Sequence, residues 1–157
     1  MIFITLGSQK FQFNRLLKKI DELIEAKIIT EDVFAQIGYS DYTPHNYAYK
    51  KFLDREEFSD IQAKSDIIIT HAGTGAIMGA LKKGKKVIAV PRLAKYGEHV
   101  DDHQLQIINQ FKNQNLICGL NDCCELENGL EYVKEHKFDT YISNTQRFID
   151  DIINYIG

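Results

Sequence analysis

Long apolar segments are absent from this sequence of 157 residues. A membrane-spanning helix needs about eighteen consecutive apolar residues, and no run in this sequence is that long. We therefore expect no part of this chain to cross a bilayer. The N-terminal sequence MIFITLGSQKF also lacks the basic region and the cleavage site of a signal peptide. We therefore interpret it as a first strand and expect a cytoplasmic protein.

An excess of basic charge is missing as well. The chain has 19 Lys and Arg residues against 22 Asp and Glu residues, a formal net charge of -3, so we expect no nucleic-acid partner. The three cysteines, Cys118, Cys123 and Cys124, are an odd number with two of them adjacent. This pattern suits neither a disulfide framework nor a zinc site, and it predicts reduced thiols in the cytosol.

Short runs rich in Ile and Val alternate with amphipathic segments. The runs are Ile2–Leu6, Val33–Ile37, Ile67–Thr70, Val87–Val90 and, more weakly, Leu116–Cys118. Continuous apolar runs are typical of strands that are buried on both faces of a parallel sheet. Apolar residues at helical spacing occur within 13–24, 105–111 and 148–156. The pattern predicts one α/β domain over residues 1–157 with a doubly wound, mostly parallel, Rossmann-like sheet.

In such a sheet, ligands bind beyond the carboxyl ends of the strands, so the residues directly after each run are candidates. Gly7, Ser8 and Gln9 follow the first run. Glycine permits close approach of the backbone, and the two polar side chains can hydrogen-bond a phosphate or a sugar hydroxyl. An ordinary polar strand-to-helix turn explains the same three residues, and taken alone they do not decide between the two.

The sequence T-H-A-G-T-G follows the third run and contains His71, Gly73, Thr74 and Gly75. The glycines let the next helix expose its first N–H groups, and Thr74 can cap that helix or donate to a phosphate. This predicts a pyrophosphate site; a tight turn that needs glycine is the alternative. The fingerprint G-x-G-x-x-G is absent and no acid ends the second run, which disfavours a dinucleotide-dependent oxidoreductase.

Arg92 follows the fourth run, and the polar sequence H-V-D-D-H-Q comes soon after it. His99 and His103 are four residues apart, a spacing that suits a metal ion, but no third ligand is evident. We therefore expect these residues to recognise a ligand without a metal. Capping of the next helix explains Asp102, whose charge suits a helix N-terminus, but it does not explain both histidines together with Gln104.

Together, the motifs T-H-A-G-T-G, G-K-K-V-I-A-V-P-R and H-V-D-D-H-Q resemble those of the C-terminal domain of family 28 glycosyltransferases, over roughly the whole chain. Within that family the chain is similar to the small subunits of split enzymes. These transfer N-acetylglucosamine in dolichol-linked glycan synthesis, or build bacterial capsular and exopolysaccharide units, as in β-1,4-galactosyltransferase pairs. The resemblance implies a GT-B C-terminal half that binds a UDP-sugar as substrate, with no cofactor and no metal.

The resemblance also implies roles by position. The Gly7–Gln9 turn would face the phosphates or the sugar, and His71 with Gly73–Gly75 would form the diphosphate loop. His103 and Gln104 would hold the donor sugar or the ribose. Relatives often carry an acid for the ribose hydroxyls where this chain has Gly79, so backbone groups or a partner residue would replace that contact.

The function that follows is the UDP-sugar-binding catalytic subunit of a two-component inverting hexosyltransferase. It would transfer a hexose or N-acetylhexosamine to a lipid-linked saccharide, held at the inner face of the membrane by a membrane-associated, acceptor-binding partner subunit. We expect that partner to supply the general base, with His71 and His103 as alternatives. The broad apolar surface of residues 143–157 predicts a helix that docks the partner or packs within the chain. A non-catalytic nucleotide-sugar-binding or stabilising subunit is the alternative function.

Overall fold

A six-stranded sheet forms the centre of the computed structural model, which describes residues 1–7, 10–71, 73–98 and 103–140, apart from the side chain of His103. The strands are β1 (Ile2–Thr5), β2 (Val33–Gln36), β3 (Ala48–Lys50), β4 (Ile67–Thr70), β5 (Lys86–Ala89) and β6 (Cys118–Gly119). Their order is β3-β2-β1-β4-β5-β6, and all neighbours pair in parallel. This doubly wound order confirms the predicted fold class. The direction in which successive strands are added to the sheet reverses between β1 and β4.

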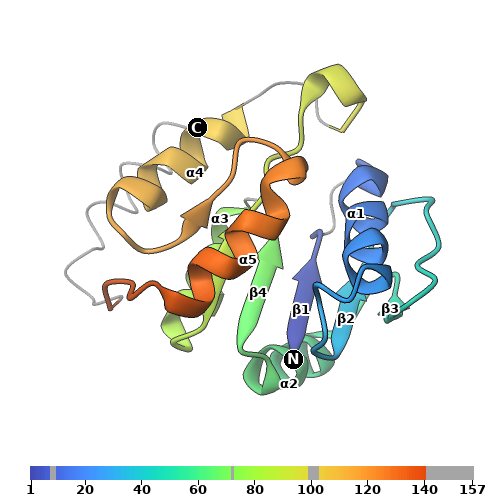
Figure 1. Cartoon of the computed structure of the whole chain (residues 1–157), viewed down its shortest axis with the longest axis horizontal. Helices are drawn as coiled ribbons and strands as arrows, with labels where there is room; N and C mark the ends of the chain where they lie inside the picture. Colours follow the sequence, from blue (N-terminus) through green and yellow to red (C-terminus); the bar gives the residue numbers. More distant parts are fainter. Residues whose placement is uncertain (8–9, 72, 99–102, 141–157) are drawn as a thin grey trace.

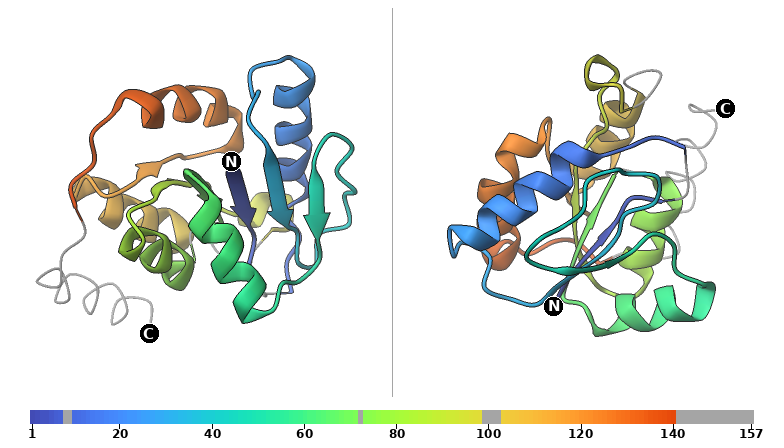
Figure 2. Two further views of the ribbon diagram at one scale, coloured as in Figure 1. Left: turned by 90° about the horizontal axis from the view of Figure 1, so that it is seen from below. Right: turned by 90° about the vertical axis from the view of Figure 1, so that its right-hand side faces the viewer.

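Helices cover both faces of the sheet (Figures 1 and 2). They are α1 (Asn14–Glu25), α2 (Arg55–Lys64), α3 (Thr74–Lys82), α4 (His103–Asn113) and α5 (Leu126–Glu135), with short 3-10 turns η1 (Ala94–Tyr96) and η2 (Cys123–Glu125). Helices α1 and α5 lie on one face, and α2, α3 and α4 lie on the other. Within the described ranges, no helix has the length and apolar character needed to cross a membrane.

The strands form because both of their faces are buried. Successive side chains of a strand point to opposite faces, so Ile2 and Ile4 pack with Leu17 of α1, while Phe3 packs on the other side of the sheet. There the Phe3 ring meets the Phe58 ring of α2 edge-on, with 5.2 Å between the ring centroids. Burial on both faces is why these strands are continuous apolar runs in the sequence.

Three elements were not predicted from the sequence: β3, α2 and α5. All three residues of β3 are exposed, and a polar edge strand of this length carries no apolar run. Helix α2 contributes only the partly buried Phe58 and Ile61 to the apolar core. In α5, Leu126, Leu130 and Val133 do have helical spacing, but three residues are a weak signal.

A buried carboxylate of α1 holds the segment between β2 and β3. The carboxylate of Asp21 accepts hydrogen bonds from the Tyr42 hydroxyl at 2.6 Å and from the backbone N–H groups of His45 and Asn46, each at 2.9 Å. Burial by itself would raise the pKa of Asp21, but these hydrogen bonds to the charged form hold that pKa below its usual value. The hydrogen bond from the Tyr42 hydroxyl to Asp21 also raises the pKa of Tyr42 to about 12.

Replacing this carboxylate should weaken the fold. We expect Asp21→Asn to lower the free energy of unfolding by about 1–3 kcal/mol at neutral pH, because an amide cannot accept from donors at both of its ends. The folded pKa of Asp21 is lowered, so its contribution is complete above the unfolded pKa of about 4 and is lost as the pH falls through the folded pKa. Urea unfolding of both chains over this pH range should therefore show the difference shrinking in acid. The exposed Asp41→Asn is the matched control, and equal urea midpoints for all three chains would contradict the prediction.

Candidate functional site

The loops that follow β1, β4 and β5 meet at the carboxyl edge of the sheet, which is the upper edge in Figure 1. This edge includes the point where the strand order reverses, as the sequence predicts for a ligand site. Of the predicted site residues, the structure describes Gly7, His71, Gly73, Thr74, Gly75, Arg92 and Gln104. Ser8, Gln9, His99, Asp102 and the side chain of His103 lie outside the described residues.

The ring of His71 is buried between two glycines at this edge. Its Nδ1 atom lies 3.3 Å from the carbonyl oxygen of Thr5. A Cβ atom on Gly7 or on Gly73 would lie 2.7 Å from an atom of the His71 ring, so neither position admits a side chain as it stands. Gly7 also has a φ of +70°, and a Cβ on Gly38 would lie 2.9 Å from the Gly7 carbonyl oxygen. This packing gives the His71 ring a part in the shape of the loops.

Helix α3 begins with unshielded N–H groups. Its first intrahelical bond runs from the N–H of Ile77 to the carbonyl oxygen of Gly73, so the N–H groups of Thr74, Gly75 and Ala76 have no acceptor within the helix. Gly73 is the N-cap and Thr74 is the first helical residue, so of the two roles open to Thr74, capping is not the one adopted. A Cβ on the exposed Gly75 would meet no atom of the described residues within 4 Å, so this part of the chain leaves space beside Gly75. Free N–H donors and the helix dipole suit an anion there.

Arg92 is the largest fully buried side chain of the described residues. Its Nη2 atom donates to the carbonyl oxygens of Leu6 at 2.8 Å and Phe11 at 3.2 Å, and so braces the loop after β1. Since β4 lies between β5 and β1, the Arg92 side chain crosses above the end of β4. Its Nε and Nη1 atoms have no hydrogen-bond partner in the described part of the chain. Burial lowers the pKa of Arg92 to about 10, which leaves it cationic at neutral pH.

Among the described residues α4 spans His103–Asn113, so His103 and Gln104 lie in the first described turn of the helix that follows β5. The Gln104 side chain is buried, and its Oε1 atom accepts a hydrogen bond of 2.9 Å from the N–H of Arg92. Gln104 therefore joins the helix to the loop after β5 through its amide oxygen. Among the residues that can be described, no cluster of three His, Cys, Asp or Glu side chains could hold a metal ion.

The sequence did not single out the ion pair of Arg15 and Glu98, which also lies at this edge. Arg15 Nη2 and Glu98 Oε1 are 3.0 Å apart, and the Glu98 side chain is only 1% exposed. The two residues are 83 positions apart in the chain, so no local pattern links them. From the sequence alone, a Glu within a polar loop is expected to be exposed to solvent. Only the tertiary structure shows that Glu98 is buried.

Gly79 stands where the family resemblance implies an acid in relatives, and a side chain of a neighbouring helix lies beside it. A Cβ atom on Gly79 would lie 3.8 Å from Nε2 of Gln62, a buried side chain of α2. An amide side chain, which can both donate and accept hydrogen bonds, therefore faces the second turn of α3.

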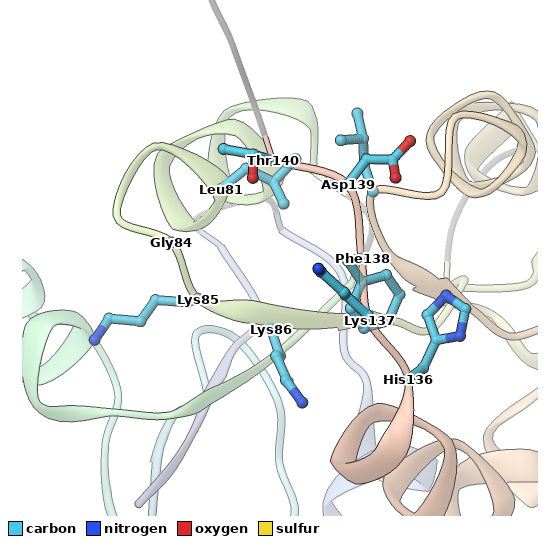
Figure 3. Close-up of a pocket in the computed structure, with 10 residues that line it drawn as sticks. Leu81, Gly84, Lys85, Lys86, His136, Lys137, Phe138, Asp139 and Thr140 are labelled. Atoms are coloured by element: carbon cyan, nitrogen blue, oxygen red, sulfur yellow. The ribbon is translucent and has the colours of Figure 1, made fainter.

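A cavity of about 380 Å³ lies at the opposite, amino-terminal edge of the sheet (Figure 3). It is bordered by the start of β5 and by residues 136–140. Two of the three lysines in its wall donate to the backbone: Lys86 to the carbonyl oxygen of Val133 at 2.5 Å, and Lys85 to that of Ala63 at 2.8 Å. Because none of the residues that line this cavity lies at a helix N-terminus, we place the functional site at the carboxyl edge instead.

Two similar curated proteins are both named UDP-N-acetylglucosamine transferase subunit ALG13. The one from Yarrowia lipolytica is 24% identical over 160 residues, which cover 87% of this chain and 80% of the relative. The one from Kluyveromyces lactis is 40% identical over 101 residues, which cover 64% of this chain and 43% of the relative. The chain thus spans most of the first relative and less than half of the second.

Among solved structures, the glycotransferase of kitacinnamycin superposes with a TM-score of 0.62 at 13% identity, over 98% of this chain and 38% of that structure. At this identity the likeness shows the fold alone, and this chain matches less than half of the larger protein. The sequence model of the glycosyltransferase family 28 C-terminal domain matches residues 1–151, which include the loops after β1, β4 and β5. The chain therefore belongs to the family of glycosyltransferase family 28 C-terminal domains.

Proposed function

We propose that this chain is the donor-binding, catalytic subunit of a two-component inverting glycosyltransferase and that its donor is a UDP-sugar. The observation that carries the proposal is the start of α3 at the strand-order reversal, where the first N–H groups have no acceptor within the helix and the described residues leave space at Gly75. A diphosphate fits this position by charge and by hydrogen bonding. The names of the two ALG13 relatives support a UDP-linked donor.

The chemistry of this edge is stabilisation of a leaving group. Negative charge develops on the UDP diphosphate as the glycosidic bond breaks, and preorganised donors lower the energy of that state. The α3 N-terminus and the buried cation of Arg92 would supply those donors and that charge without a metal ion. The general base would come from the partner, because the ring of His71 is engaged in loop packing.

A second subunit belongs to the proposal because both ALG13 relatives are named as subunits of a transferase. It would be membrane-associated, would bind a lipid-linked saccharide and would hold this chain at the cytoplasmic face of the membrane. The relatives' name favours an N-acetylhexosamine over a hexose as the transferred sugar. The segment 143–157, which the sequence predicts to dock this partner, lies outside the described residues, so that docking stays a prediction.

The proposal is tested by turnover of the reconstituted pair. We expect transfer from labelled UDP-N-acetylglucosamine or UDP-galactose to a lipid-linked acceptor only when both chains are present. A partner that is fully active alone would instead support the alternative of a stabilising subunit. A pair that assembles with a Gly75→Val chain and keeps full turnover would exclude donor binding at α3.

A size series at Gly75 separates binding from folding. Gly75→Ala should raise the free energy of unfolding by up to about 1 kcal/mol, because alanine favours a helix and its Cβ meets no protein atom. The same change should weaken UDP binding, and Gly75→Val should weaken it at least about tenfold by covering the N–H donors. Thermal melts and calorimetry measure the two effects. Asn128→Ala, exposed in α5, is the control that should stabilise the chain and leave UDP affinity unchanged; unchanged affinity in Gly75→Val would remove this site.

The residues that open α4 should act on the sugar end of the donor. We expect His103→Ala and Gln104→Ala each to reduce turnover with a UDP-sugar more than they weaken binding of UDP. For Gln104, the loss of its hydrogen bond to the N–H of Arg92 would also loosen the loop after β5. Steady-state kinetics of the pair and UDP titrations give the comparison. Full activity of both variants would reduce these residues to a structural role.

A further inference from the structure

We propose that the ion pair of Arg15 and Glu98, together with Asp122, positions the two donor-binding loops relative to each other. We call these three residues the Arg15–Glu98 clasp. Arg15 and Glu98 act here as positioning residues and are not placed in contact with the substrate. The inference rests on the proposed function, because it concerns how the same site is assembled.

The clasp has the geometry of a fork. Arg15 donates from Nε to Glu98 Oε2 and from Nη2 to Glu98 Oε1, both at 3.0 Å. Its Nη1 atom donates to the carboxylate of Asp122, just before η2. The guanidinium carbon also lies 4.1 Å from the centroid of the Tyr96 ring, which covers it. A planar guanidinium held on two carboxylates and one aromatic face has a single favourable orientation.

The clasp joins the two loops close to the predicted site residues Gly7 and His103. Arg15 lies in the first turn of α1, directly after the loop that contains Gly7. Glu98 directly precedes residues 99–102, which lead to His103 at the start of α4. One ion pair therefore sets the distance between the loop near the proposed diphosphate and the loop near the proposed sugar.

The loop before Glu98 folds around the same carboxylate. The N–H of Leu93 donates to Glu98 Oε1 at 3.0 Å, so the acid closes the turn that contains η1. Gln12 supports the arrangement from the other loop, since its Nε2 donates to the carbonyl oxygens of Tyr96 at 3.2 Å and Gly97 at 3.4 Å. The contacts thus run from one loop to the other at several points, with the ion pair at the centre.

Stability alone is a poor reason for such a pair. A buried carboxylate is costly to desolvate, and an apolar contact of similar volume often stabilises a fold as well or better. What the ion pair adds is a defined geometry, because the fork fixes both the distance and the angle between its partners. A displacement of about 1 Å at a site of this kind is enough to change turnover strongly.

The test compares UDP with UDP-N-acetylglucosamine and UDP-galactose on the full chain. Glu98→Gln removes the charge, keeps an oxygen for the N–H of Leu93 and leaves Arg15 paired with Asp122. Arg15→Lys keeps the positive charge and loses the fork, so it decides the question if Glu98→Gln does not fold. We expect both variants to weaken binding of the sugar nucleotide about tenfold while UDP affinity changes less than about threefold. In the reconstituted pair, the KM for the donor should rise more than kcat falls.

Two controls make the result specific. The exposed pair Lys50–Glu57 has a 2.7 Å contact at the other end of the sheet, and Lys50→Gln should leave both affinities unchanged. The double variant Arg15→Lys/Glu98→Gln should be no worse than the more severe single variant, because both changes disrupt the same ion pair.

The outcomes separate the clasp from the proposed function. A folded Glu98→Gln or Arg15→Lys chain with an unchanged ratio of the two affinities would overturn the positioning role, and so would an equal loss of UDP and sugar-nucleotide binding. A wild-type chain that binds UDP but neither sugar nucleotide, or that binds none of the three, would overturn the proposed function itself.

Discussion

The parallel pairing of β1 with β4 is the constraint on which the rest of this structure depends. It sets Thr5 beside Thr70, so that both strands end at the same level and their loops emerge side by side. The ring of His71 can then reach the carbonyl oxygen of Thr5 and fill the space between Gly7 and Gly73. The glycines are required by this packing, and the start of α3 is placed at the strand-order reversal as a consequence.

Electrostatics divides the carboxyl edge into two parts. Around β4, the unshielded start of α3 and the buried Arg92 make the environment positive, with spare donors on the guanidinium. Around the loop after β5, Arg15 neutralises the carboxylate of Glu98. Burial by itself would lower the pKa of Arg15, but its hydrogen bond to Glu98 and the nearby negative charges raise that pKa. An anionic ligand is thus favoured at α3, and Arg15 neutralises the charge of Glu98 that would otherwise repel that ligand.

The described part of the chain looks like one side of a divided site. Its donors for an anion lie at the carboxyl edge, whereas the cavity of Figure 3 lies at the far edge, where Lys85 and Lys86 donate to backbone carbonyl groups. A site that a second protein half completes need not form a closed cavity in one half, which agrees with the proposed two-subunit arrangement.

The sequence by itself determined the buried strands, the doubly wound order of elements, the glycine loop and a helix over residues 105–111. All of these follow from patterns within a few neighbouring residues, namely apolar runs, helical spacing and glycine positions. The polar edge strand β3 was missed because strand pairing alone, without burial, holds it in place. No local pattern revealed it.

Only the tertiary structure decided what the polar residues of the loops do. The sequence left Thr74 as a cap or a phosphate donor, and the structure excludes the cap because Gly73 takes that position. Gln104 has an oxygen that is committed to the N–H of Arg92, twelve residues away, and Glu98 is paired with Arg15, 83 residues away. Such partners are brought together by the crossing of strands and loops, so their hydrogen bonds exist only once the sheet has formed.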